Sequence, residues 1–189
     1  GTTAGERNVV SGNTHDGIYL DDSTGNTISG NYVGLNAAGT AGLANGGDGI
    51  YLTGSTGNII GGTIAGAGNV TSGNDLSGIS LNNGSNTNLI AGNYAGTNAA
   101  GTSAISNGST NAGIWISSSN NNTIGGTVAG ARNVISGNVY DGIDINNSSG
   151  TLVEGNYIGT DVTGTADLGN GEDGIYIFNG STGNTVGGT

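Results

Sequence analysis

The stretch NTIGGTVAGARNVISGNVYDGIDI, from Asn122 to Ile145, decides the fold because it contains three short motifs that recur along the chain. One of them, Gly-Ile-x-(Ile/Leu), occurs six times, at Gly17, Gly49, Gly78, Gly113, Gly142 and Gly174. Successive copies are 32, 29, 35, 29 and 32 residues apart. Self-similarity at such a period indicates a repeat architecture.

The other two motifs recur in a fixed order with the first. An Asn opens a short apolar strand at Asn8, Asn31, Asn69, Asn93, Asn133 and Asn156. A polar-x-apolar strand opens at Asn26, Asn58, Asn88, Asn122, Thr151 and Asn184. We therefore predict an all-β chain of about six three-strand coils, which alternate between 29–30 and 32–35 residues. Two coils together span about 62 residues, so residues 1–189 form one domain of three superrepeats.

The strands alternate with a period of two, which places their aliphatic residues on one face. The Gly-Ile motif supplies the column Ile18/Leu20, Ile50/Leu52, Ile79/Leu81, Ile114/Ile116, Ile143/Ile145 and Ile175/Ile177. The other strands supply Ile28, Ile60, Ile90, Ile124, Val153 and Val186, and Val10, Val33, Thr71, Ala95, Ile135 and Ile158. Three facing aliphatic columns predict a β-solenoid. The repeated Asn residues are expected to stack and to hydrogen-bond from coil to coil.

Charge and composition exclude several functions. The net charge is −11, and Arg7 and Arg132 are the only basic side chains besides the single His. Nucleic-acid binding and adhesion to anionic membranes both need clustered Lys and Arg. No apolar run approaches a transmembrane helix in length, so we expect no membrane insertion. The absence of Cys fits bacterial secreted proteins without fixing the compartment, and we expect an extracellular or cell-surface location.

The opening stretch, followed by GNYIGTDVTGTADLGNGEDGIYI from Gly155 to Ile177, resembles the repeats of large bacterial secreted and cell-surface proteins in the pectin-lyase-like superfamily. The resemblance implies a right-handed parallel β-helix. That superfamily includes lyases, hydrolases, adhesins and spacers, so its fold does not determine function. Its enzymes typically place Arg or Lys near an acidic substrate, whereas Arg7 and Arg132 occupy equivalent repeat positions here. We therefore expect no enzymatic activity and no obligatory cofactor.

Two outward-facing columns are the candidate sites. The first is acidic and comprises Asp16, Asp48, Asp141 and Asp173 at the corners before the Gly-Ile strands. Because neighbouring coils lie about 4.8 Å apart, these carboxylates have three open outcomes: a shared proton, a bound cation such as Ca²⁺, or exposure to solvent. The second column is aromatic and comprises Tyr19, Tyr51, Trp115 and Tyr176. It suits stacking on sugar rings, contact with a protein, or packing within the sheet.

The resulting functional hypothesis is structural. The chain is expected to be a segment of an extracellular fibre, filament or cell-surface stalk. Its coils show no capping helix, and Gly188 and Thr189 repeat Gly1 and Thr2. We expect its partners to be copies of itself stacked head-to-tail, or adjoining repeats of a longer chain. The alternative is a carbohydrate-binding or polysaccharide-degrading β-helix, with glycans as partners of the aromatic or acidic column.

Overall fold

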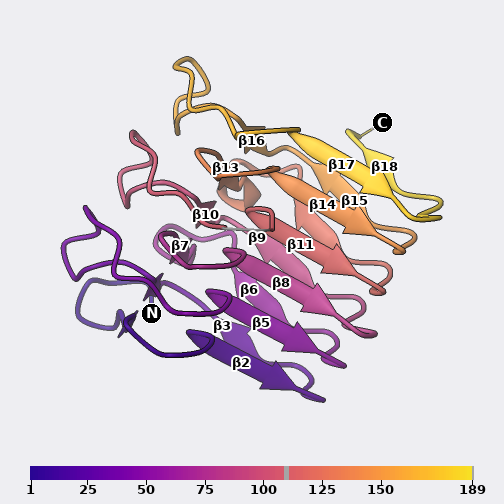
Figure 1. Ribbon diagram of the computed structural model, residues 1–189, viewed down its shortest axis with the longest axis horizontal. Helices are drawn as coiled ribbons and strands as arrows, with labels where there is room; N and C mark the ends of the chain where they lie inside the picture. The colour runs from indigo at the N-terminus through magenta and orange to yellow at the C-terminus, as the bar shows by residue number, and fades with distance from the viewer. Residues whose placement is uncertain (109–110, 189) are drawn as a thin grey trace.

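The computed structural model describes residues 1–108 and 111–188, and these residues form a right-handed parallel β-helix of six coils (Figure 1). Each coil contributes one strand to each of three sheets, so the predicted all-β solenoid is confirmed. The match between the chain's two ends includes Thr189, which lies outside the described residues. Among the described residues, no helix has the length and hydrophobicity of a membrane span.

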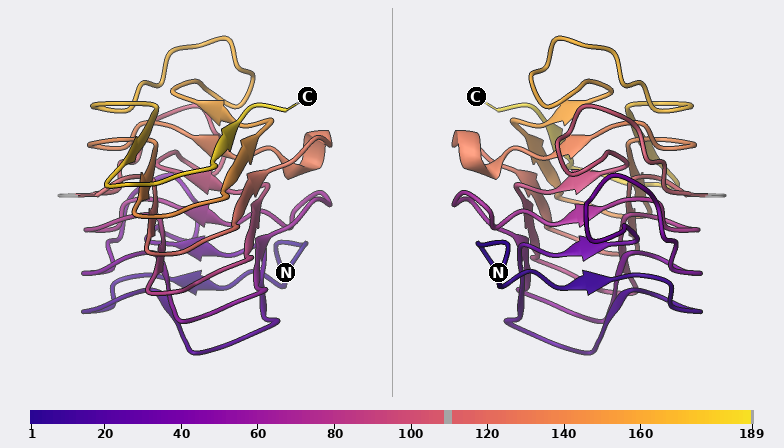
Figure 2. Two further views of the ribbon diagram at one scale, coloured as in Figure 1. Left: turned by 90° about the vertical axis from the view of Figure 1, so that its right-hand side faces the viewer. Right: turned by 90° about the vertical axis from the view of Figure 1, so that its left-hand side faces the viewer.

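The three sheets are six-stranded and parallel. Sheet 1 contains β1 (Val9–Val10), β4 (Tyr32–Val33), β7 (Val70–Thr71), β10 (Tyr94–Ala95), β13 (Val134–Ile135) and β16 (Tyr157–Ile158). Sheet 2 contains β2 (Ile18–Asp21), β5 (Ile50–Thr53), β8 (Ile79–Asn82), β11 (Ile114–Ser117), β14 (Ile143–Asn146) and β17 (Ile175–Phe178). Sheet 3 contains β3 (Thr27–Ile28), β6 (Ile59–Gly61), β9 (Leu89–Ala91), β12 (Thr123–Gly125), β15 (Leu152–Glu154) and β18 (Thr185–Val186). The three sheets enclose one narrow interior (Figure 2).

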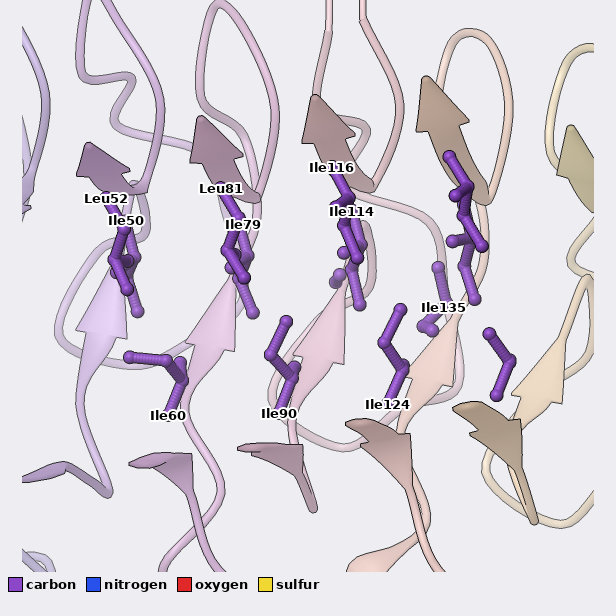
Figure 3. Close-up of a cluster of buried hydrophobic side chains, with 14 of the residues drawn as sticks. Ile50, Leu52, Ile60, Ile79, Leu81, Ile90, Ile114, Ile116, Ile124 and Ile135 are labelled. Carbon is purple, nitrogen blue, oxygen red and sulfur yellow. The ribbon is translucent and has the colours of Figure 1, made fainter. Parts of the chain in front are cut away.

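The interior is filled by the predicted aliphatic columns. Sheet 2 keeps strict register, so that Ile50, Ile79 and Ile114 pair side by side and are fully buried. Figure 3 shows these side chains meeting those of Ile60, Ile90 and Ile124 from sheet 3. In the sixth coil the same columns continue, but Ile177 and Val186 are 39% and 56% exposed because no further coil covers them.

Polar ladders run beside the aliphatic columns. The predicted Asn ladder of sheet 1 is continuous: each Asn side chain donates to the next Asn carbonyl oxygen from Asn8 to Asn156. For example, Asn69 Nδ2 donates to Asn93 Oδ1 at 3.0 Å, and the backbone N–H of Asn69 donates to the same atom. These bonds satisfy buried amide groups that would otherwise be costly.

Two further ladders were not predicted from the sequence. One is formed by the Asn residues before the Gly-Ile strands: Asn13, Asn45, Asn74, Asn107, Asn138 and Asn170. The other is formed by Ser hydroxyls that accept the backbone N–H of the previous coil: Ser55, Ser85, Ser119, Ser148 and Ser181. Every corner of the solenoid is therefore held by a repeated side-chain hydrogen bond.

The turns after sheet 3 require glycine. Gly125 has a φ of +94°, and a Cβ there would lie 2.0 Å from the carbonyl oxygen of Glu154 in the next coil. A short 3-10 helix, η1 (Ala129–Ala131), follows this turn. The long loops of the second, fourth and sixth coils project on one side of the molecule (Figure 1). They stack through bonds from Ala99 N–H to Gly39 and from Val162 N–H to Gly101, both at 2.9 Å.

Candidate functional site

The acidic column lies at the corner that leads into sheet 2, and its carboxylates bind backbone rather than one another. Asp16 Oδ1 accepts the backbone N–H of Asp48 at 2.8 Å, and Asp48 Oδ1 accepts that of Ser77 at 2.7 Å. Asp141 Oδ1 accepts the backbone N–H of Asp173 at 2.6 Å. The four predicted residues therefore form two separate pairs, Asp16 with Asp48 and Asp141 with Asp173, because Ser77 and Ala112 occupy the same position in the third and fourth coils.

The electrostatics of this column depend on burial. Burial raises the pKa of Asp48 from 3.8 to about 6, and the hydrogen bond from the Ser77 backbone opposes that rise. Within residues 1–108 and 111–188, no three His, Cys, Asp or Glu side chains are grouped in a way that would hold a metal ion. The Ca²⁺ expectation for Asp16, Asp48, Asp141 and Asp173 stays a prediction.

A fifth carboxyl, Asp144, lies in a more unusual place on the outer face of sheet 2. Its register neighbours are Trp115 in β11 and Tyr176 in β17. Asp144 is only 5% exposed, and its Oδ1 is buried without a hydrogen-bond partner. Burial, followed by repulsion from Asp141, raises the pKa of Asp144 from 3.8 to about 7. Asp144 therefore holds its proton well above the range in which an exposed aspartic acid ionises.

The aromatic column divides into two groups. Tyr19 and Tyr51 form a tilted pair with ring centroids 5.3 Å apart, and Tyr19 remains 55% exposed. At the other end, Tyr176 stacks on Phe178 at 4.3 Å, and Trp115 meets Phe178 edge-on at 6.2 Å. Trp115 Nε1 also donates to Asn82 Oδ1 at 3.3 Å. The predicted contact face is therefore a tyrosine pair, in which Tyr19 is exposed and Tyr51 half-buried, and a separate cluster, in which Trp115 is held by its neighbours.

Sequence reasoning missed Phe178, which completes that cluster. Phe178 is the only Phe of the chain and follows the sixth Gly-Ile motif directly. The residues paired with it in sheet 2 are polar, as at Asn146 and Ser117. A lone aromatic residue at a position that is otherwise polar was the available signal. Its ring contacts both Trp115 and Tyr176, the two residues that flank Asp144 in register.

The two arginines stack on tyrosine rings of sheet 1. The guanidinium carbon of Arg7 lies 4.0 Å from the ring centroid of Tyr32, and that of Arg132 lies 4.0 Å from Tyr157. Each arginine precedes the sheet 1 strand of one coil, and its tyrosine opens the sheet 1 strand of the next. These contacts explain why the arginines recur at equivalent repeat positions.

Comparison with known families gives one match. A family model described as periplasmic copper-binding protein (NosD) matches residues 4–100, which is 97 of the 189 residues. No curated protein and no solved structure matches the chain. The match covers the first three coils and reaches into the fourth, and the same repeats continue beyond it.

Proposed function

Since the chain belongs to the NosD family of right-handed β-helix proteins, we propose that it forms a rigid structural segment outside the cytoplasm, extended by stacking of coil on coil. The family description names a periplasmic protein, which agrees with a location beyond the cytoplasmic membrane. The finer expectation, a fibre, filament or cell-surface stalk, is part of this proposal. So is the absence of catalysis, since the Asp141 carboxylate is engaged by the backbone N–H of Asp173 in the next coil.

The copper of the family description does not suit this chain. Protein copper sites use His, Cys and Met as ligands. The chain contains one His, no Cys and no Met, and His15 is exposed at a coil corner. The part of the chain that the structure describes contains no cluster of metal-ligating side chains. We therefore propose no copper-dependent step, and the structural role rests on the solenoid itself.

The observation that supports a structural role is the unbroken register of the coils. All strand pairs are parallel, and equivalent residues face one another in every pair of sheet 2. In the sixth coil the strand edges and the side chains of Ile177 and Val186 have the geometry that a further coil would cover. An unpaired strand edge with apolar side chains favours pairing with another strand. The covering coil belongs either to adjoining repeats or to a second copy.

Electron microscopy of the purified chain tests this proposal. We expect narrow filaments in which six coils advance by roughly 29 Å, given a strand spacing of about 4.8 Å. The variant Val186→Asp places a charge on the uncovered column and should shorten or abolish the filaments.

Val128→Asp is the matched control, because Val128 is 57% exposed on the loop before η1 and Val186 is 56% exposed on the open coil. Circular dichroism checks that both variants keep the β-sheet signal. Short discrete rods of the unaltered chain, or an equal effect of the two variants, would contradict stacking between copies.

The alternative, carbohydrate binding, is favoured by one observation: the Tyr19 and Tyr51 rings lie next to each other on a flat sheet face, and Tyr19 is largely exposed. Such a platform suits the apolar face of a sugar ring. A glycan panel tests the alternative, with Tyr19→Ala expected to remove binding. Trp115→Ala is the comparison, since Trp115 is held by Phe178 and Asn82. Binding that survives Tyr19→Ala argues against this platform.

A further inference from the structure

The three superrepeats place a tyrosine at the same point of sheet 1, where β4, β10 and β16 begin: Tyr32, Tyr94 and Tyr157. One side of each ring is closed by a glycine of the long loop that follows. A Cβ added at Gly39, Gly101 or Gly164 would lie 2.9, 3.1 or 2.8 Å from the ring of its tyrosine. The loop backbone therefore packs directly on the three rings in the same way.

The other side of the ring is covered by a guanidinium in two of the three superrepeats. Arg7 covers Tyr32 and Arg132 covers Tyr157, both at 4.0 Å. Arg132 also donates from Nε to the carbonyl oxygen of Gly155 at 3.0 Å. A planar cation over a tyrosine ring is a favourable contact, and more so when water is excluded. The first and third superrepeats thus show which chemical group this ring position accepts.

The second superrepeat lacks that group. Aligning GERNV, GAGNV and GARNV places Gly68 where the other two superrepeats have Arg7 and Arg132. Both arginines are stacked on other tyrosines and the chain contains no lysine, so neither an arginine nor a lysine of the chain covers Tyr94. A Cβ at Gly68 would lie 1.7 Å from the carbonyl oxygen of Gly92, so the backbone here has closed on the space that an arginine stem would need.

A cavity of about 190 Å³ remains beside Tyr94. Its walls include Gly66, Gly68, Gly92 and Tyr94, and Arg7 and Tyr32 also line it. Tyr32 and Tyr94 are two coils apart along the sheet, about 10 Å at the usual strand spacing. At that separation, physiological salt screens much of the repulsion between Arg7 and a second cation over Tyr94.

We propose that this cavity binds the guanidinium of an arginine side chain from a partner polypeptide, which stacks on Tyr94 as Arg7 stacks on Tyr32. The partner's arginine supplies the planar cation that the second superrepeat lacks, because Gly68 stands at the arginine position. The chain's charge of −11 attracts a basic partner over long range. Arginine binding beside Tyr94 does not depend on coil stacking, because the Tyr94 cavity lies on the side of the solenoid, between coils that are already paired.

The test uses N-acetyl-arginine amide as the probe and the NMR signals of the tyrosine rings as the readout. We expect a saturable shift of the Tyr94 signals, with weaker binding of N-acetyl-citrulline amide, which has a similar shape and no charge. Tyr94→Leu, followed through the signals of Tyr32, which also lines the cavity, should weaken binding about 2- to 30-fold, which corresponds to the usual range of a cation–aromatic contact. Tyr157→Leu is the matched control, since Arg132 already covers that ring.

A second variant provides a gain of binding. Arg132→Ala uncovers Tyr157 and should create a second site, seen as a new probe-dependent shift of the Tyr157 signals. A general attraction of the cationic probe to the acidic chain would not single out that ring. The proposal is overturned if citrulline binds as tightly as arginine, if Tyr94→Leu and Tyr157→Leu weaken binding equally, or if Tyr94 does not respond.

Discussion

At the scale of single residues, Asp144 is the clearest conflict between a side chain and its surroundings. It is buried between its register neighbours Trp115 and Tyr176, with Oδ1 unpartnered and with Asp141, Glu172 and Asp173 as its negative neighbours. Its pKa rises from 3.8 to about 7 on folding, so the folded state binds more protons than the unfolded state between these values. The free energy of unfolding should therefore fall as the pH rises from about 4 to 7.

Asp144→Asn should remove this pH dependence from the site. We expect its Tm to lie close to that of the unaltered protein at low pH and clearly above it at alkaline pH. Asp161→Asn is the control of opposite sign. The Thr163 hydroxyl and nearby backbone N–H groups bind the Asp161 carboxylate and lower its pKa, so its stabilising effect is present at neutral pH and lost in acid. A Tm gain for Asp144→Asn that is the same at all pH values would show that the carboxyl does not titrate as proposed.

At the scale of one element, the ladder beside sheet 3 contains a single substitution. Asn26, Asn58, Asn88 and Asn122 are joined by side-chain hydrogen bonds, and Asn184 closes the ladder at the sixth coil. Thr151 occupies the position between Asn122 and Asn184, and its Oγ1 is buried without a partner. The shorter side chain leaves a gap in the row of amides.

Thr151→Asn should restore the ladder and stabilise the protein by about 0.5–1.5 kcal/mol, the usual net value of one buried hydrogen bond. Urea unfolding, with the shift of the midpoint at unchanged slope, measures this gain. Thr27→Asn is a suitable control because Thr27 is exposed on β3, next to Asn26 of the same ladder. A neutral or destabilising Thr151→Asn would mean that the corner backbone at this coil does not accept the longer side chain.

The same ladders show which features the sequence could predict. A repeat spaced at two residues within a strand fixes the face of each aliphatic residue, so the columns through Ile50, Ile60 and Ala95 were predictable. The Ser ladder through Ser55 and Ser85 lies at turns, where Ser is common for many local reasons, and repetition alone did not distinguish it. The Phe178 cluster depends on contacts between coils, and the stacking of Tyr176 on Phe178 could not follow from spacing.

For the molecule as a whole, stability should depend on position along the solenoid axis, because each coil contacts its two neighbours. The central coils are covered on both sides, and Ile114 and Ile116 are fully buried there. In the sixth coil the equivalent Ile177 is 39% exposed. The backbone N–H of Ile114 donates to Gly142 in the next coil, and the N–H of Ile143 donates to Gly174. Opening should therefore begin at the terminal coils and proceed inward.

Amide hydrogen exchange at low protein concentration measures this gradient. We expect protection to be highest in β8 and β11 and to fall toward β2 and β17, the two edge strands of sheet 2. At concentrations where copies stack, a second coil covers β17, and its protection should rise toward that of β11. Uniform protection at low concentration would mean that the six coils unfold as one cooperative unit. If the protection gradient does not change with protein concentration, the protection of β17 does not depend on stacking between copies. Adjoining repeats of a longer chain would then be the proposed stacking partner.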